Sequence, residues 1–259
     1  KLLQKKRTRS WASLHNRFDN MYRFDNPELP TLQPWVNRTR PPATRFIGER
    51  NPYYHRVDEK GRQLPYIDKF IMAVSDGKLI AAKAGTGEVD LQARSLAFNN
   101  LTFLRENEKD GKFDTFLWRI AKGAHVALFP NLNVDDLVWS KMMRDVRFRR
   151  ALSLGVDREA INESLFFGLA LMGNNTLLPD SPLFRKEYQK QWAEYDPDMA
   201  NEILDEMGLT KYDDDDIRLL SDGRPMEIII ETAGEDTEQT DVLELVAEAW
   251  AEIGIKLFI

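Results

Sequence analysis

A short polar stretch at residues 231–237 is the part of this sequence best suited to bind a ligand. It follows the apolar run 226–230, which predicts a buried strand, and it precedes a helical pattern. Ligands of open α/β sheets lie beyond the carboxyl ends of the strands, and a helix N-terminus offers free N–H groups to anions. The candidate ligand-binding residues of this stretch are Glu231, Thr232, Gly234 and Asp236. The alternative is that the stretch only caps the helix, because Asp236 and Gln239 have the spacing of a capping box.

Other residues that could carry chemistry lack a spacing that assigns them a role. Residues 213–216 are four aspartates with Asp222 nearby, but they do not match the alternating carboxylates of a calcium loop. We interpret them as a solvated loop before a strand at 218–220. The three histidines, His15, His55 and His125, are far apart. The sequence contains no phosphate-binding loop, nucleophile elbow or zinc motif, so we predict no catalytic residue, no metal and no cofactor.

Composition restricts the class of protein. The chain has 259 residues, a net charge of -6 and no cysteine, so it forms no disulfide, which is compatible with export. It contains no run of 18 apolar residues. Residues 1–56 carry 12 Lys and Arg against 4 Asp and Glu. These arginines are scattered among Pro and Asn without a basic helix or an RNA-binding motif, so we predict no nucleic-acid partner.

Periodicity and breaker residues predict an α/β (mixed α+β) chain. A proline-rich loop at 26–42 separates a short helix from the first strands, and a domain boundary falls near residues 74–77. The expected helices are 11–18, 78–84 and 95–108, and the expected strands are 44–49, 67–74 and 88–91. Two β-rich runs, 112–120 and 124–130, should form a hairpin around Lys122 and Gly123. The last unit is a strand, a helix and a strand in parallel pairing, with the helix face formed by Val242, Val246, Ala249, Trp250 and Ile253.

Residues 145–167 predict two helices joined by a tight corner. Phe148, Ala151 and Leu152 form one apolar stripe, Gly155 ends the first helix and Asp157 caps the second. A later helix should begin at Asp196 and end near Gly208.

The same residues resemble the signature "VRxALxxAIDRxxI" of the peptide-binding class of extracellular solute-binding proteins (family 5), the receptors that feed ABC importers. Four further segments are similar to family motifs in the same order. Residues 49–68 resemble "NPxYW…PYID", with His55 where the family often has Trp, and residues 84–90 resemble "AGEID" with two residues inserted. Residues 195–208 resemble "YDPxxAxxLLxExG", and residues 226–256 match a strand–helix–strand unit.

The resemblance implies a periplasmic-binding-protein-like fold. Residues 1–74 would be the end of lobe I and residues 75–259 most of lobe II, and we expect the chain to be a fragment truncated at both ends. It also implies that the loop after residue 230 faces the cleft between the lobes. Asn131 and Asn133 become further candidates, because residues 129–133 are similar to the family's "GLNxxYLxxN" strand near the cleft. The family's acidic anchor for a peptide amino terminus lies in a stretch after residue 259, so it is assigned to no residue.

The function that the resemblance implies is that of the substrate-binding component of an ABC importer. Such a receptor would be a periplasmic or extracellular monomer that binds oligopeptides without converting them and presents them to a membrane permease. Relatives that take oligosaccharides or nickel complexes leave the ligand open. An α/β hydrolase or transferase with no readable motif is the alternative from another class.

Overall fold

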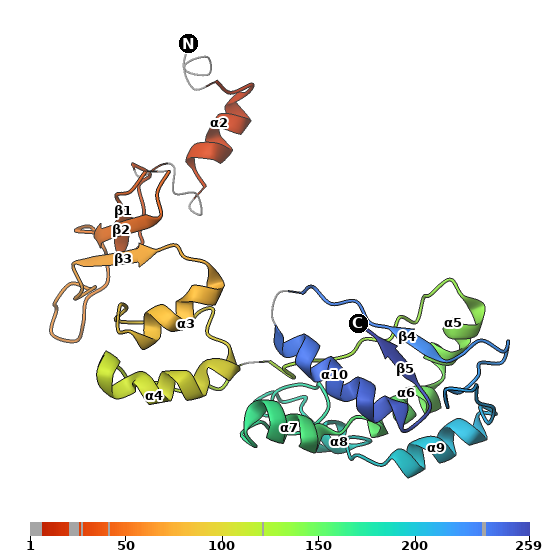
Figure 1. The fold of residues 1–259 in the computed structure, drawn as a ribbon. Coiled ribbons are helices and arrows are strands. Elements are labelled where there is room, and N and C mark those ends of the chain that lie inside the picture. The colour runs from red at the N-terminus through yellow and green to blue at the C-terminus, as the bar shows by residue number, and fades with distance from the viewer. Residues whose placement is uncertain (1–6, 21–25, 27, 41, 121, 235–236) are drawn as a thin grey trace. The chain divides into compact units, whose positions relative to one another are not determined.

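The computed structural model describes residues 7–20, 26, 28–40, 42–120, 122–234 and 237–259 (Figure 1). The chain consists of two compact units, Lys1–Ser95 and Leu96–Ile259. The predicted division after residue 74 falls inside the first unit, and its assignment to lobes of a receptor stays a prediction.

The first unit contains a three-stranded antiparallel sheet in the order β1-β2-β3. Gly48 of β2 pairs with Phe70 of β3, and a Cβ atom at Gly48 would lie 2.1 Å from the Phe70 ring, so a glycine is needed there. The elements are α2 (Trp11–Phe18), β1 (Trp35–Asn37), β2 (Arg45–Arg50), β3 (Lys69–Ala73) and α3 (Gly77–Gly85). The helices and strands predicted at 11–18, 44–49, 67–74 and 78–84 are confirmed within two residues.

The second unit packs helices around a two-stranded parallel sheet of β4 and β5. Helix α10 connects the two strands and packs against β5 and α7 (Figure 1). The helices are η1 (Phe98–Asn100), α4 (Leu101–Gly111), α5 (Leu137–Arg144), α6 (Val146–Leu154), α7 (Arg158–Phe166), α8 (Lys186–Lys190), α9 (Pro197–Glu206) and α10 (Thr237–Ala251). The strands are β4 (Glu227–Ile229) and β5 (Lys256–Phe258). The predicted strand–helix–strand unit with parallel pairing is confirmed.

One apolar core holds the second unit together. Helix α6 contributes Phe148, Ala151 and Leu152, and all five residues of the predicted α10 face are buried. The indole Nε1 of Trp250 donates a hydrogen bond to the carbonyl of Leu152, 3.1 Å away, and so ties α10 to α6. Burial of these side chains is the main stabilising contribution of the second unit.

Three predicted elements are wrong, and a fourth, the helix at 95–108, is confirmed only from Leu101 onward. Residues 88–91 form no strand, the helix expected from residue 95 begins at Leu101 after η1, and residues 218–220 form only isolated bridges. The predicted hairpin is absent from the described parts of 112–130, where Trp118 is 74% exposed, because an extended apolar run needs a neighbouring strand to form a ladder. Gly123 instead allows its backbone to pack closely against Thr176, since a Cβ atom at Gly123 would lie 2.5 Å from the Thr176 carbonyl oxygen.

Candidate functional site

The carboxyl ends of β4 and β5 meet at one edge of the sheet. The parallel ladder continues past β4, where Ile230 N–H donates to the Phe258 carbonyl at 2.8 Å. Glu231 then leaves the sheet with an exposed side chain, and Thr232 Oγ1 accepts a hydrogen bond from Gly234 N–H at 3.2 Å. Three of the four candidates from this loop therefore lie directly beyond a strand end, as predicted. Asp236, with its predicted capping box, lies outside the described residues.

The segment that carries Asn131 and Asn133 is anchored to the elements on both sides of this loop. At one end, His125 Nδ1 lies 3.4 Å from Glu238 Oε1 in the first turn of α10. At the other end, the carboxylate of Asp136 lies 2.8 Å from Arg224 Nη2, in the turn that precedes β4.

The two asparagines are exposed, and Asn131 Oδ1 accepts a hydrogen bond from Asn133 N–H at 2.9 Å. Across the described part of the chain, no hydrogen bond joins either side chain to Glu231 or Thr232. The structure thus ties both candidate segments to the same elements and leaves the side chains of Asn131, Asn133 and Glu231 exposed.

The charges at the amino end of β4 are structural. Arg224 binds Asp136 and also Asp222, at 2.7 Å. The pKa of Asp136 is lowered by the hydrogen bond from Trp139 N–H and further by Arg224, and the pKa of Asp222 is lowered mainly by its hydrogen bond with Arg224. Both carboxylates are therefore held ionised, so they are poor general acids and instead fix the turn before β4.

The remaining sequence candidates give no reactive site. Asp213 folds its own loop, because its Oδ1 accepts hydrogen bonds from Asp215 N–H and Ile217 N–H at 3.0 and 2.9 Å. Within the described ranges, no group of three or more His, Cys, Asp or Glu side chains is arranged to hold a metal ion. None of the helices in the described part of the chain has the length and apolar character that crossing a bilayer requires.

Comparison with known proteins decides the family. The model of the bacterial extracellular solute-binding proteins, family 5 Middle, matches residues 12–259. The chain belongs to this family. The family prediction and the periplasmic-binding-protein-like α/β fold are thereby confirmed.

Three similar proteins illustrate the range of family 5. A solved structure of the oligopeptide-binding protein OppA is 42% identical, with a TM-score of 0.68, and the match covers 96% of this chain and 40% of that chain. The periplasmic alpha-galactoside-binding protein of Rhizobium meliloti (strain 1021) is 26% identical over 180 residues, 64% of this chain and 25% of the relative. A probable ABC transporter-binding protein of Deinococcus radiodurans is 25% identical over 240 residues, 90% of this chain and 40% of the relative. The chain thus spans 25–40% of the length of these relatives.

In this family 5 chain the signature at 145–167 builds the scaffold. Asp145 Oδ1 accepts a hydrogen bond from Arg147 N–H at the start of α6, and Asp157 Oδ1 accepts one from Ala160 N–H at the start of α7. Gly155 lies between them, where a Cβ atom would come within 2.8 Å of Ile253 Cδ1. The predicted caps and corner are confirmed, and the signature positions the core rather than a ligand.

The family motif of the first unit is also structural. Asn51 is 3% exposed, and its Nδ2 donates to the carbonyls of Thr31 and Gln33 at 2.9 and 3.0 Å. The Tyr66 hydroxyl donates to Asp58 Oδ2 at 2.6 Å, and this bond together with hydrogen bonds from Arg62 and Lys60 lowers the pKa of Asp58 to about 2. Both contacts close loops around the sheet.

Among the described residues, Arg218 is the most buried charged side chain, and no sequence motif marked it. The side chain of Arg218 is fully buried, and its guanidinium donates to Asp205 Oδ1 at 2.5 Å, to Asn201 Oδ1 at 2.7 Å and to the Ile253 carbonyl at 3.0 Å. The only local signal is an arginine among the apolar residues 217–220.

Proposed function

We propose that this chain is part of the substrate-binding component of an ABC importer, and that it binds oligopeptides and releases them unchanged. The observation that carries the proposal is the 42% identity to the oligopeptide-binding protein OppA over 96% of this chain. Membership of family 5 supports the broader part of the proposal, the binding of a solute, because the members of the family are extracellular solute-binding proteins.

The polar edge beyond β4 supports a peptide ligand. A peptide presents N–H and C=O groups in alternation, and the amide side chains of Asn131 and Asn133 can both donate and accept. Glu231 supplies a carboxylate for a peptide ammonium group, and exposed backbone near Gly234 can pair with the peptide main chain. In this proposal, Asp236 adds a second carboxylate to the same loop.

The proposal includes the arrangement of the whole receptor. Residues 1–74 would belong to lobe I and residues 75–259 to lobe II, with closure of the lobes by bending near Val74. The closed receptor would act as a monomer outside the cytoplasm and would deliver its ligand to the membrane permease. No catalytic step is part of this cycle.

An oligosaccharide is the second candidate ligand. It is favoured by one observation, the match to the alpha-galactoside-binding protein of Rhizobium meliloti (strain 1021). That match has lower identity and covers less of this chain than the match to OppA, so we place oligopeptides first.

Calorimetric titration of the whole receptor to which we assign this chain, with trialanine, tetraalanine and raffinose, tests both ligands, with OppA as the positive control for peptides. We expect heat of binding from the peptides and none from raffinose. Stronger binding of raffinose, or no binding of either peptide, would contradict the proposal. Chromatography of each titrated solution after a day adds a check of chemistry, because hydrolysed peptide would point to an enzyme.

A further inference from the structure

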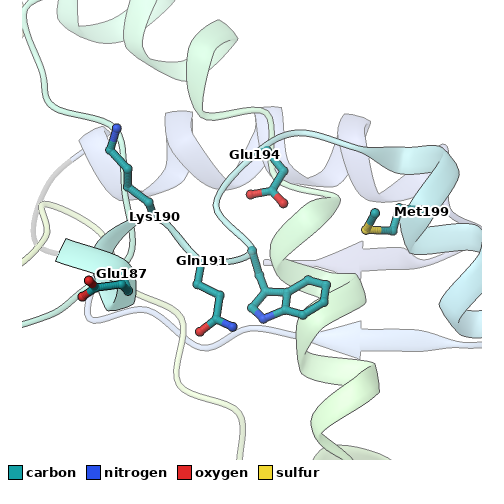
Figure 2. A pocket seen from close by; sticks show the side chains of 6 residues that line it. Glu187, Lys190, Gln191, Glu194 and Met199 are labelled. Atoms are coloured by element: carbon teal, nitrogen blue, oxygen red, sulfur yellow. The ribbon is translucent and has the colours of Figure 1, made fainter. Parts of the chain in front are cut away.

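An open hollow of about 590 Å³ lies beside α8 and the start of α9 (Figure 2). Its volume is within the range of small-molecule sites. The hollow is separate from the polar edge beyond β4, since the two share no residue. The lining residues are Glu187, Lys190, Gln191, Trp192, Glu194 and Met199.

The backbone under the hollow is held in an unusual conformation. Trp192 has a φ of +59°, which a bulky side chain rarely adopts. Three successive carbonyls, those of residues 191–193, each accept a hydrogen bond from a side chain of another segment. The donors are Asn174 Nδ2 at 2.7 Å, Ser153 Oγ at 2.6 Å and Arg158 Nη1 at 3.1 Å.

These three donors are joined to one another. Arg158 Nη2 donates to Ser153 Oγ at 3.0 Å and to Asn174 Oδ1 at 3.3 Å. Arg158 is largely buried, and burial lowers its pKa. A connected network of this kind can maintain a strained residue, and strain of this kind is concentrated at functional sites. The network therefore fixes the position of Trp192 beside the hollow.

The indole of Trp192 has groups available for a ligand. The guanidinium carbon of Arg150 lies 4.7 Å from the centre of the indole ring. Among the described residues, no protein group accepts a hydrogen bond from Trp192 Nε1–H. Arg150 lies over the ring and Trp192 packs partly against the core, so the half-buried indole offers its remaining apolar surface and the Nε1–H donor.

The charges around the hollow balance. Glu187 and Glu194 carry two negative charges, and Lys190 and Arg150 carry two positive charges. Because the net charge around the hollow is zero, it does not favour an ionic ligand. The carboxylates and the amide of Gln191 can bind hydroxyl groups. A neutral sugar ring matches an indole flanked by hydrogen-bonding side chains. The C–H groups on the faces of the sugar ring stack on the indole, while its hydroxyl groups form hydrogen bonds.

We propose that this hollow is a binding site for a neutral pyranoside, which stacks on Trp192 and donates hydrogen bonds to Glu194 and Glu187. This site is independent of the proposed peptide site, so the failure of one leaves the other standing.

Nitrogen-15 spectra of the indole N–H groups of the 259-residue chain test the proposal, with methyl α-D-galactopyranoside as the probe. The variant Trp192→Phe assigns the Trp192 signal by its disappearance. We expect that signal to shift saturably with the probe, while the Trp250 signal stays in place because its N–H is bonded to Leu152. Mannitol, which has hydroxyls but no ring, should cause no saturable shift.

Two variants distinguish a specific site from a general effect of sugar. Glu194→Gln and Gln191→Ala should each weaken the probe's affinity at least threefold, whereas Glu163→Gln on the exposed surface of α7 should leave it unchanged. If the Trp192 signal shows no saturable shift at probe concentrations up to about 100 mM, the proposal is overturned, because this concentration is far above a millimolar dissociation constant. It is equally overturned by the same shift with mannitol, or by unchanged affinity in both hollow variants.

Discussion

Arg218 and Asn201 are joined by a hydrogen bond of 2.7 Å in the interior of the second unit, where the arginine side chain is closed off from solvent. The same guanidinium binds Asp205 of α9 and the carbonyl of Ile253, just after α10, so one charge connects three segments that are distant in sequence. An aromatic neighbour, Tyr212, lies 4.9 Å from it.

Replacing Arg218 by Met should therefore lower the free energy of unfolding by about 3 kcal/mol, because the variant leaves buried carbonyl and side-chain acceptors without a donor. Urea denaturation followed by the fluorescence of buried Trp250 measures the loss. Arg105→Met is the matched control, since Arg105 forms an exposed ion pair with Glu108, and it should cost less than about 0.5 kcal/mol. Equal losses in the two variants would contradict the role of Arg218.

Gly155 and Gly77 form a second matched pair. A Cβ atom at Gly155 would lie 2.8 Å from Ile253 Cδ1 and 3.2 Å from Trp250 Cδ1, so Gly155→Ala should destabilise the chain by roughly 1–3 kcal/mol through overpacking. Gly77 has open space around the same position at the start of α3, so Gly77→Ala should stabilise by roughly 0.5 kcal/mol. Thermal unfolding of both variants gives the sign of each change. A neutral Gly155→Ala variant would show that the corner after α6 is loosely packed.

Tyr195 should give stability a dependence on alkaline pH. Its hydroxyl donates to Glu252 Oε2 at 2.9 Å, and burial together with this bond raises the pKa of Tyr195 to about 12. Because the folded pKa lies above the ordinary value of about 10, the contribution of the protonated phenol is complete below pH 10 and is lost as the pH rises through 12.

The difference in urea midpoint between the native chain and Tyr195→Phe should accordingly be constant up to about pH 10 and shrink above it. Tyr188, which is 62% exposed, provides the control substitution Tyr188→Phe. A difference that is independent of pH up to about 12 would show that the phenol of Tyr195 is not protected.

The proposed peptide-binding residues Glu231 and Asn133 predict a loss of affinity without a loss of stability. Glu231→Gln and Asn133→Ala should each weaken the binding of trialanine roughly three- to tenfold, the effect of one exposed hydrogen bond or ion pair. Both side chains are exposed, so the free energy of unfolding should change by less than about 0.5 kcal/mol. Glu202→Gln, exposed on α9, is the control and should bind normally. Unchanged affinity in both site variants would exclude this edge from the peptide site.

Local signals in the sequence predicted α6, α7, α9 and α10 of the second unit, but not α5 or α8. Asp157 and Asp196 each accept a hydrogen bond from a backbone N–H three residues later, and Gly155 and Gly208 mark the ends of the helices before them. Each of these signals acts within one turn of helix, so a short window of sequence contains all the information.

Contacts over long sequence distances could not be predicted in the same way. The run 112–120 has the composition of a strand, but strand formation depends on a neighbour that no local pattern identifies. Arg218 finds its partners 13, 17 and 35 residues away, and Arg158 reaches a carbonyl 35 residues away. For the candidate site, the strand-end rule located Glu231, whereas the anchoring of residues 125 and 136 required the structure.

The parallel pairing of β4 with β5 also predicts an order of folding events. The two strands are joined by the whole of α10, so their ladder closes a long loop, and this costs chain entropy before any hydrogen bond forms. We expect docking of α10, which packs against α7 and β5, to shorten that search. Mutations such as Val246→Ala in α10 should therefore slow refolding, whereas changes at the tip of β5 should mainly accelerate unfolding.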